Sequence, residues 1–196
     1  MDSGYRTRIE EFLSVSLPVD FDYNPIRSIK LLDKVRMEAL MLERAPFFFI
    51  EKAVALLNAD SACYSVIGEA LISRERTAGH FPDRPIVPLI ELCKSIAQTG
   101  MVLAAFYGDQ TKIPIAISAG KSKATAKSLI DAPATILIRA SLTRFRSPLN
   151  VVNGTTYLVE ADRSLAEIGR LDDVTYTLID RDEALGKRTT LALASQ

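Results

Sequence analysis

The chain has a single histidine, His80, and it lies in a proline-rich segment that could place it for proton transfer. The segment is Gly79-His80-Phe81-Pro82-Asp83-Arg84-Pro85-Ile86-Val87-Pro88, and its prolines restrict the backbone around the imidazole. A neutral imidazole is a competent base near pH 7. The apolar run that follows predicts a helix, whose first backbone N–H groups near Leu89 are available to an oxyanion. The competing interpretation is a half-buried histidine that binds a backbone carbonyl.

The spacing in this segment is more specific than the histidine alone. Gly-His-Phe-Pro is followed by two residues, Pro85, two residues and Pro88, and an Ala-Gln pair stands at 97–98. Upstream, 44–48 reads Arg-Ala-Pro-Phe-Phe. This pattern closely resembles the signature of the hotdog β-hydroxyacyl-acyl-carrier-protein dehydratases, over roughly 44–179. The resemblance implies that His80 is the base for dehydration of a 3-hydroxyacyl thioester and that the Leu89 N–H is the oxyanion donor.

Two positions depart from that signature. Counted forward from His80 without gaps, the family's acid falls at Lys94, and its glycine after the last proline falls at Leu89. Three hypotheses follow from the lost acid. Glu91, three residues before Lys94, replaces it; or a related subunit supplies it across a heterodimer; or the chain is a pseudoenzyme that binds an acyl chain or carrier protein without turnover. The alternative for Glu91 is an ion pair with Lys94 or a solvated residue of the first helical turn.

The remaining site predictions concern substrate and carrier. We expect Phe81, Pro88, Lys94 and Gln98 to line the substrate site. A lysine cluster in a chain of zero net charge suits docking of an acidic carrier protein, or else it is a solvated strand edge that discourages aggregation. The lysines of this cluster are Lys121, Lys123 and Lys127.

Composition excludes several other classes. The pI of about 6.6 gives no basic footprint for nucleic acid. One histidine and two separated cysteines, Cys63 and Cys93, make a metal site unexpected, and we expect no cofactor. The charged N-terminus lacks the apolar run of a signal peptide, and the apolar stretches predict no membrane span. We therefore expect a cytoplasmic protein with reduced thiols.

The pattern of apolar residues predicts the elements that hold this loop. Helices are expected from Ser3 to Pro18 and from Ile26 to about Arg44. The order that follows is two strands, one long buried helix and four strands in a meander. The predicted ranges are strands 47–57 and 62–72, helix 88–107, and strands 113–119, 134–144, 151–161 and 168–179.

We therefore predict an α+β hotdog fold, a bent antiparallel sheet wrapped around a long central helix. Residues 1–43 form a helical N-terminal extension that caps the fold, 44–182 the hotdog domain, and 183–196 a tail. By resemblance the protein is a hydro-lyase acting on 3-hydroxyacyl or enoyl thioesters of acyl-carrier protein in fatty-acid or polyketide-type synthesis. It is a homodimer or a heterodimer with a related hotdog subunit. The alternative is a non-catalytic hotdog pseudoenzyme that binds acyl chains or carrier protein.

Overall fold

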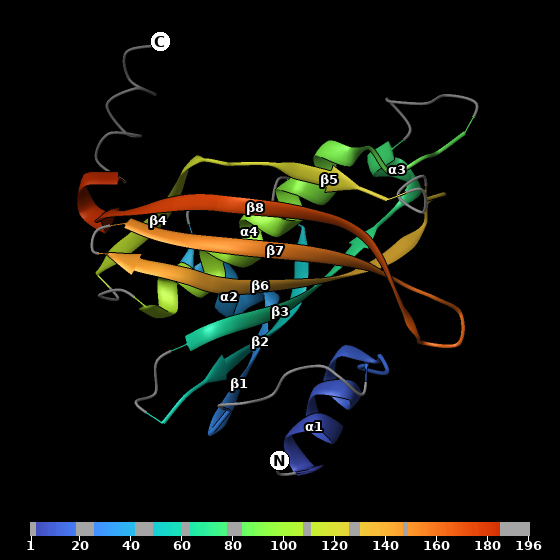
Figure 1. Ribbon diagram of the computed structural model, residues 1–196, viewed down its shortest axis with the longest axis horizontal. Helices are drawn as coiled ribbons and strands as arrows, with labels where there is room; N and C mark the ends of the chain where they lie inside the picture. The colour runs from blue at the N-terminus through green and yellow to red at the C-terminus, as the bar shows by residue number, and fades with distance from the viewer. Residues whose placement is uncertain are drawn as a thin grey trace.

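The computed structural model describes residues 3–18, 26–41, 49–59, 63–77, 84–107, 111–125, 130–146 and 149–184. Its helices are α1 (Ser3–Leu13), α2 (Lys34–Leu40), α3 (Arg74–Thr77) and α4 (Leu89–Tyr107). Its strands are β1 (Ser28–Asp33), β2 (Ile50–Leu57), β3 (Cys63–Ile72), β4 (Lys112–Ser118), β5 (Ser122–Ala124), β6 (Ala134–Arg146), β7 (Leu149–Val159) and β8 (Leu165–Asp180). Together the strands form one antiparallel sheet in the order β1-β2-β3-β6-β7-β8-β4, with β5 also paired to β8 (Figure 1).

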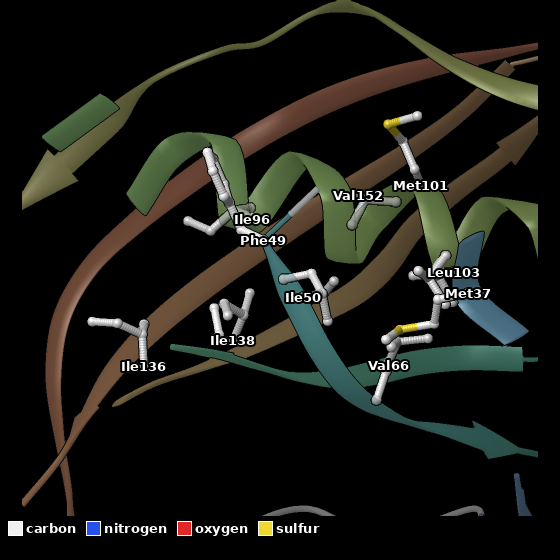
Figure 2. Packing of buried hydrophobic residues seen from close by; sticks show 14 of the residues in the cluster. Met37, Phe49, Ile50, Val66, Ile96, Met101, Leu103, Ile136, Ile138 and Val152 are labelled. Atoms are coloured by element: carbon white, nitrogen blue, oxygen red, sulfur yellow. The ribbon is translucent and has the colours of Figure 1, made fainter. Parts of the chain in front are cut away.

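The long helix α4 packs along one face of this sheet, behind β6, β7 and β8 in the view of Figure 1. Inward side chains such as Val66, Ile138 and Val152 meet α4 residues such as Ile96 and Leu103 (Figure 2). By length and composition α4 could span a membrane, but 61% of its 18-residue apolar window is buried inside the fold. It is therefore the core helix, and the predicted α+β arrangement of a bent antiparallel sheet around a central helix is confirmed.

The opposite face of the sheet is covered in part by α1. Successive side chains of a strand point to opposite faces, so Val54 and Leu56 face away from α4 while their neighbours face it. Val54 and Leu56 cluster with the buried Ile9 and Leu13 of α1. The expected N-terminal helix is confirmed, and it covers the second face of the sheet.

Two topological predictions were wrong. The segment expected to be one helix from Ile26 to Arg44 contains β1, which pairs with β2, before the short helix α2 begins. In this segment Ile29 and Leu31, two residues apart, pack on the face of the sheet that α1 covers, while Leu32 packs on the α4 face, which is the spacing of a strand. The expected four-strand meander is wrong for β4, which pairs with β8 and not with β6. The boundaries set at 43 and 182 stay a prediction.

Candidate active site

The first half of α4 carries most of the predicted site residues that the structure describes. Its height above the sheet is set by two glycines on the strands beneath it. An added Cβ at Gly154 in β7 would lie 2.1 Å from Ile96 Cγ2, and one at Gly68 in β3 would lie 2.8 Å from Thr99 Oγ1. Only glycine permits so close an approach of helix and sheet. The close contact fixes where the first turns of α4 lie.

Gln98 joins α4 to the segment that enters β2. Its Oε1 accepts a hydrogen bond of 2.8 Å from the backbone N–H of Phe49, and the Gln98 side chain is buried. The side-chain oxygen of Gln98, a residue predicted to bind substrate, therefore holds the backbone just before β2 against α4. A role of Gln98 toward substrate stays a prediction.

Phe49 is the aromatic surface against which two cationic side chains pack. The Lys94 Nζ lies 4.5 Å and the Arg76 Cζ 4.3 Å from the centroid of its ring. A cation beside an aromatic face is attracted by the ring quadrupole. The ammonium at the position of the family's acid is thus packed on the Phe49 ring, which itself is only 6% exposed.

Glu91 lies on the first turn of α4 and is half-buried. Its N–H donates to the Pro88 carbonyl at 2.9 Å, and its own carbonyl accepts from the Ser95 hydroxyl at 2.8 Å. Its carboxyl oxygen Oε2 is buried and has no hydrogen-bond partner among the residues that the structure describes. Among the ion pairs of the described residues, none joins Glu91 to Lys94. If Glu91 has no catalytic role, the sequence suggests either an ion pair with Lys94 or a solvated carboxylate. The buried Oε2 atom fits neither description.

The start of α4 presents apolar side chains to solvent. Leu89 is 44% and Ile90 63% exposed, while Pro88 before them is half-buried. Leu89 opens the helix, so its N–H has no intrahelical acceptor, as the sequence predicted. The Leu89 side chain is therefore outside the core, at the surface where the expected thioester would approach.

Other predicted residues lie apart from α4 or outside the described residues. His80, Phe81 and Lys127 are outside them. Lys121 and Lys123 are exposed at the sheet edge formed by β4 and β5, where Lys123 is opposite Arg170 of β8. No group of three or more metal-ligating side chains occurs within the part of the chain that the structure describes.

Sequence reasoning missed the neighbours that give Lys94 its setting. Arg76 lies in the four-residue helix α3, where the sequence carries no signal that would place it against Phe49. It also missed Tyr176, a buried residue of β8 whose hydroxyl donates to the Ala97 carbonyl at 2.8 Å. Burial raises the pKa of Tyr176, so it serves as a neutral hydrogen-bond donor to α4.

The chain resembles known proteins both in sequence and in fold. No family model matches the chain. The 3-hydroxyacyl-acyl-carrier-protein dehydratase FabZ of Staphylococcus carnosus is 29% identical over 129 residues, which are 66% of this chain and 79% of that protein. The FabZ of Staphylococcus haemolyticus is 28% identical over 131 residues, again 66% of this chain and 79% of that protein.

Solved structures share the architecture at low identity. The dehydratase heterocomplex ApeI:P from Xenorhabdus doucetiae superposes with a TM-score of 0.55 at 13% identity, covering 76% of this chain and 95% of that one. A thioesterase superfamily member from Thermus thermophilus gives a TM-score of 0.50 at 14% identity, covering 68% and 95%. The fold is therefore that of hotdog proteins, and together with the sequence relatives it supports a member of the hotdog-fold dehydratase family.

Proposed function

We propose that the protein is a dehydratase-type subunit that acts on 3-hydroxyacyl or enoyl thioesters of acyl-carrier protein, in fatty-acid or polyketide-type synthesis. His80 removes the α-proton, the Leu89 N–H stabilises the enolate-like oxygen, and Glu91 protonates the departing hydroxyl. The observation that carries the proposal is the Glu91 carboxyl oxygen, buried one helical turn from Lys94 without a hydrogen-bond partner among the described residues. A buried carboxyl oxygen that lacks a protein partner would gain a hydrogen bond from a substrate hydroxyl.

The carrier and the second subunit follow from the exposed surfaces. Lys121 and Lys123 at the exposed edge suit an acidic carrier protein. β4 pairs with a different part of β8 than β5 does, and it has backbone groups on one side that a second hotdog subunit could pair; its Ile117 is 55% exposed. We propose a dimer through β4, with a copy of the chain or with a related subunit, in the cytoplasm, which leaves the lysines beside β5 to the carrier protein. The heterocomplex neighbour supports the second choice as a precedent for the fold.

A non-catalytic role is the second candidate, and one observation favours it. The Lys94 ammonium is packed 4.5 Å from the centre of the Phe49 ring, where the family has its acid. In that case the chain holds an acyl chain or carrier protein while another subunit does the chemistry, or contributes His80 to a site completed by the acid of its partner.

The test is reversible hydration of an enoyl thioester on carrier protein by the purified full chain. His80→Ala and Glu91→Gln are compared with Glu11→Gln, which removes an exposed carboxylate on α1, far from α4 in the fold. Loss of turnover in the first two variants alone supports a self-sufficient dehydratase. Turnover that survives Glu91→Gln rejects Glu91 as the acid and points to the partner. No turnover by a folded wild type that still binds carrier protein supports the non-catalytic role.

A further inference from the structure

One short segment, 130–132, is bonded to both flanks of the histidine loop. On the upstream flank, Arg74 of α3 donates from Nε to the Ala132 carbonyl at 3.2 Å. On the downstream flank, the Ala132 N–H donates to the Pro85 carbonyl at 2.7 Å, and the Val87 N–H donates to the Ile130 carbonyl at 2.8 Å. The described residues on both sides of the segment that contains His80 are therefore bonded to the same three residues.

The downstream flank is further held by an ion pair of favourable geometry. Arg84 donates from Nε and Nη2 to the two carboxylate oxygens of Asp131, at 2.7 and 3.1 Å. These hydrogen bonds raise the pKa of Arg84 and lower the pKa of Asp131, so both stay charged across the neutral range. A two-point fork of this kind fixes direction as well as distance. Ile86 forms an isolated antiparallel bridge with Asp131 beside it.

The pair contributes little to the stability of the fold. Its side chains are 61% and 59% exposed, and exposed ion pairs are screened by water and salt. Its effect is on position. Arg84 is the first described residue after the histidine loop, and α4 begins only five residues later at Leu89. The pair thus lies just before the oxyanion donor Leu89 and Glu91, and His80 is only four residues before Arg84 in the sequence.

We propose that Arg84 and Asp131 are positioning residues, which orient the histidine loop relative to the start of α4 without contact to the substrate. The expected loss of rate rests on the proposed function, whereas the expected change in the position of the loop rests on the fold alone. A displacement of a catalytic group by about 1 Å is enough to lower a rate by up to roughly 100-fold. We expect Arg84→Met or Asp131→Asn to lower kcat about tenfold at nearly constant KM.

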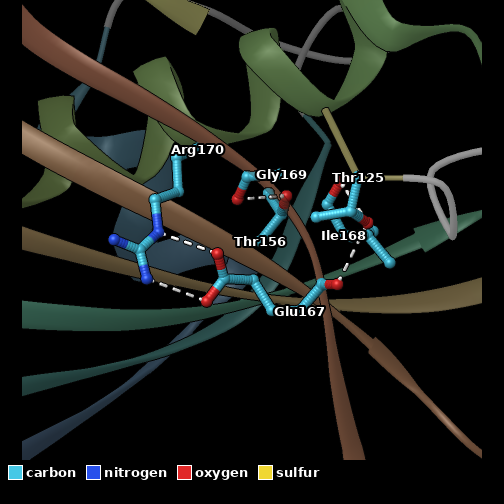
Figure 3. Close-up of polar contacts among 6 residues, drawn as sticks. All are labelled: Thr125, Thr156, Glu167, Ile168, Gly169 and Arg170. Carbon is cyan, nitrogen blue, oxygen red and sulfur yellow. Dashed lines mark hydrogen bonds and ion pairs between the residues drawn. The ribbon is translucent and has the colours of Figure 1, made fainter. Parts of the chain in front are cut away.

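The chain supplies a matched control for this experiment. Arg170 and Glu167 on β8 form a second exposed two-point pair, at 2.8 and 2.9 Å (Figure 3). Arg170→Met and Glu167→Gln remove the same chemical groups and should leave kcat unchanged. The charge-exchanged double variant Arg84→Asp with Asp131→Arg should recover most of the rate. A role confined to folding would instead shift the urea midpoint in all the Arg84 and Asp131 single variants.

A readout independent of turnover separates this proposal from the proposed function. The chain has one histidine, so its imidazole Hε1–Cε1 group gives one cross-peak in a ¹H–¹³C spectrum. Arg84→Met and Asp131→Asn should shift or broaden that peak, and the β8 controls should not. If the wild-type protein has no turnover, the proposed catalysis is rejected. The position of the histidine cross-peak in the variants still tests the positioning role. An unchanged peak in both single variants, with unchanged kcat where turnover exists, would overturn the proposal.

Discussion

The contact between Gly154 and Ile96 decides how closely α4 can approach the sheet. Gly154 lies in the middle of β7, and Ile96 points down from α4 onto it; the Ile96 side chain is 1% exposed. In Gly154→Ala the new methyl carbon would lie 2.1 Å from Ile96 Cγ2 and 3.2 Å from Ile96 Cβ. The second atom is part of the branched stem, so no rotation of the side chain about its own bonds removes both contacts.

Two opposing effects set the size of the change. Gly154 has no positive φ, so alanine fits its backbone, and the less flexible unfolded chain would add about 0.4–1 kcal/mol of stability. Overpacking of a closed core costs about 1–3 kcal/mol or more. The overlap is severe, so we expect Gly154→Ala to lower the free energy of unfolding by about 1–2 kcal/mol. Relief requires α4 to move, and Glu91 and Lys94 move with it.

Urea denaturation followed by circular dichroism measures this cost, with Ile96→Ala and the double variant completing a cycle. Ile96→Ala alone should cost about 2–5 kcal/mol. The double variant should cost less than the sum of the two by about 1–3 kcal/mol, because the added methyl then fills the space of the lost side chain. Gly169→Ala is the comparison variant: its added Cβ would meet the Lys123 carbonyl oxygen and Thr156 Oγ1 at 3.2 Å, a milder overlap away from α4, so it should cost less than Gly154→Ala. Additive costs for residues 96 and 154 would refute the reasoning.

Three further predictions concern the buried Asn150, the two cysteines and Lys94. Asn150 is fully buried and, within the described part of the chain, neither atom of its amide has a hydrogen-bond partner, so Asn150→Val should raise the free energy of unfolding by about 1–2 kcal/mol; a loss in urea denaturation would show that the amide is satisfied after all. Burial raises the pKa of Cys63 to about 12, so a thiol reagent at pH 8 should modify the half-buried Cys93 in the native protein but Cys63 only after unfolding, and rapid modification of two thiols in the native protein would contradict the burial of Cys63. Lys94→Glu restores the family's acid and should raise hydration activity, with Lys94→Met as the control for loss of charge; equal activity in both variants would show that the acid position has no part in turnover.

The sequence alone predicted those helices and strands whose pattern of apolar residues fits only one kind of element. The run from Leu89 to Tyr107 is apolar on nearly every helical face, and only a core helix buries such a surface. The segment from Ile26 was ambiguous, because its leucines and isoleucines recur at intervals that suit a helix and an edge strand alike. What decided between them is the register of β1 against β2, with Leu31 opposite Val54, which is a tertiary contact. Local periodicity holds no information about such a partner.

The site was predictable where chemistry lies in contiguous residues and not where it depends on distant ones. The order Pro88, Leu89, Glu91, Lys94 and Gln98 could be placed on one helix from sequence alone. The setting of Lys94 could not, because Phe49 and Arg76 come from two other segments. The pairing of Arg84 with Asp131, 47 residues later, was equally hidden.

The neighbours of Lys94 also explain why replacing its ammonium with a carboxylate changes more than the sign of the charge. A carboxylate in place of the ammonium would lose the attraction to the Phe49 ring and meet the negative face of that ring. The Arg76 guanidinium packs on the same ring, with its Cζ 4.3 Å from the ring centre. A positive charge in this cluster favours the charged form of a carboxyl, and a general acid must instead carry its proton. We therefore expect Lys94→Glu combined with Arg76→Met to be more active than Lys94→Glu alone, whereas an acid that comes from a partner subunit requires no change in this cluster.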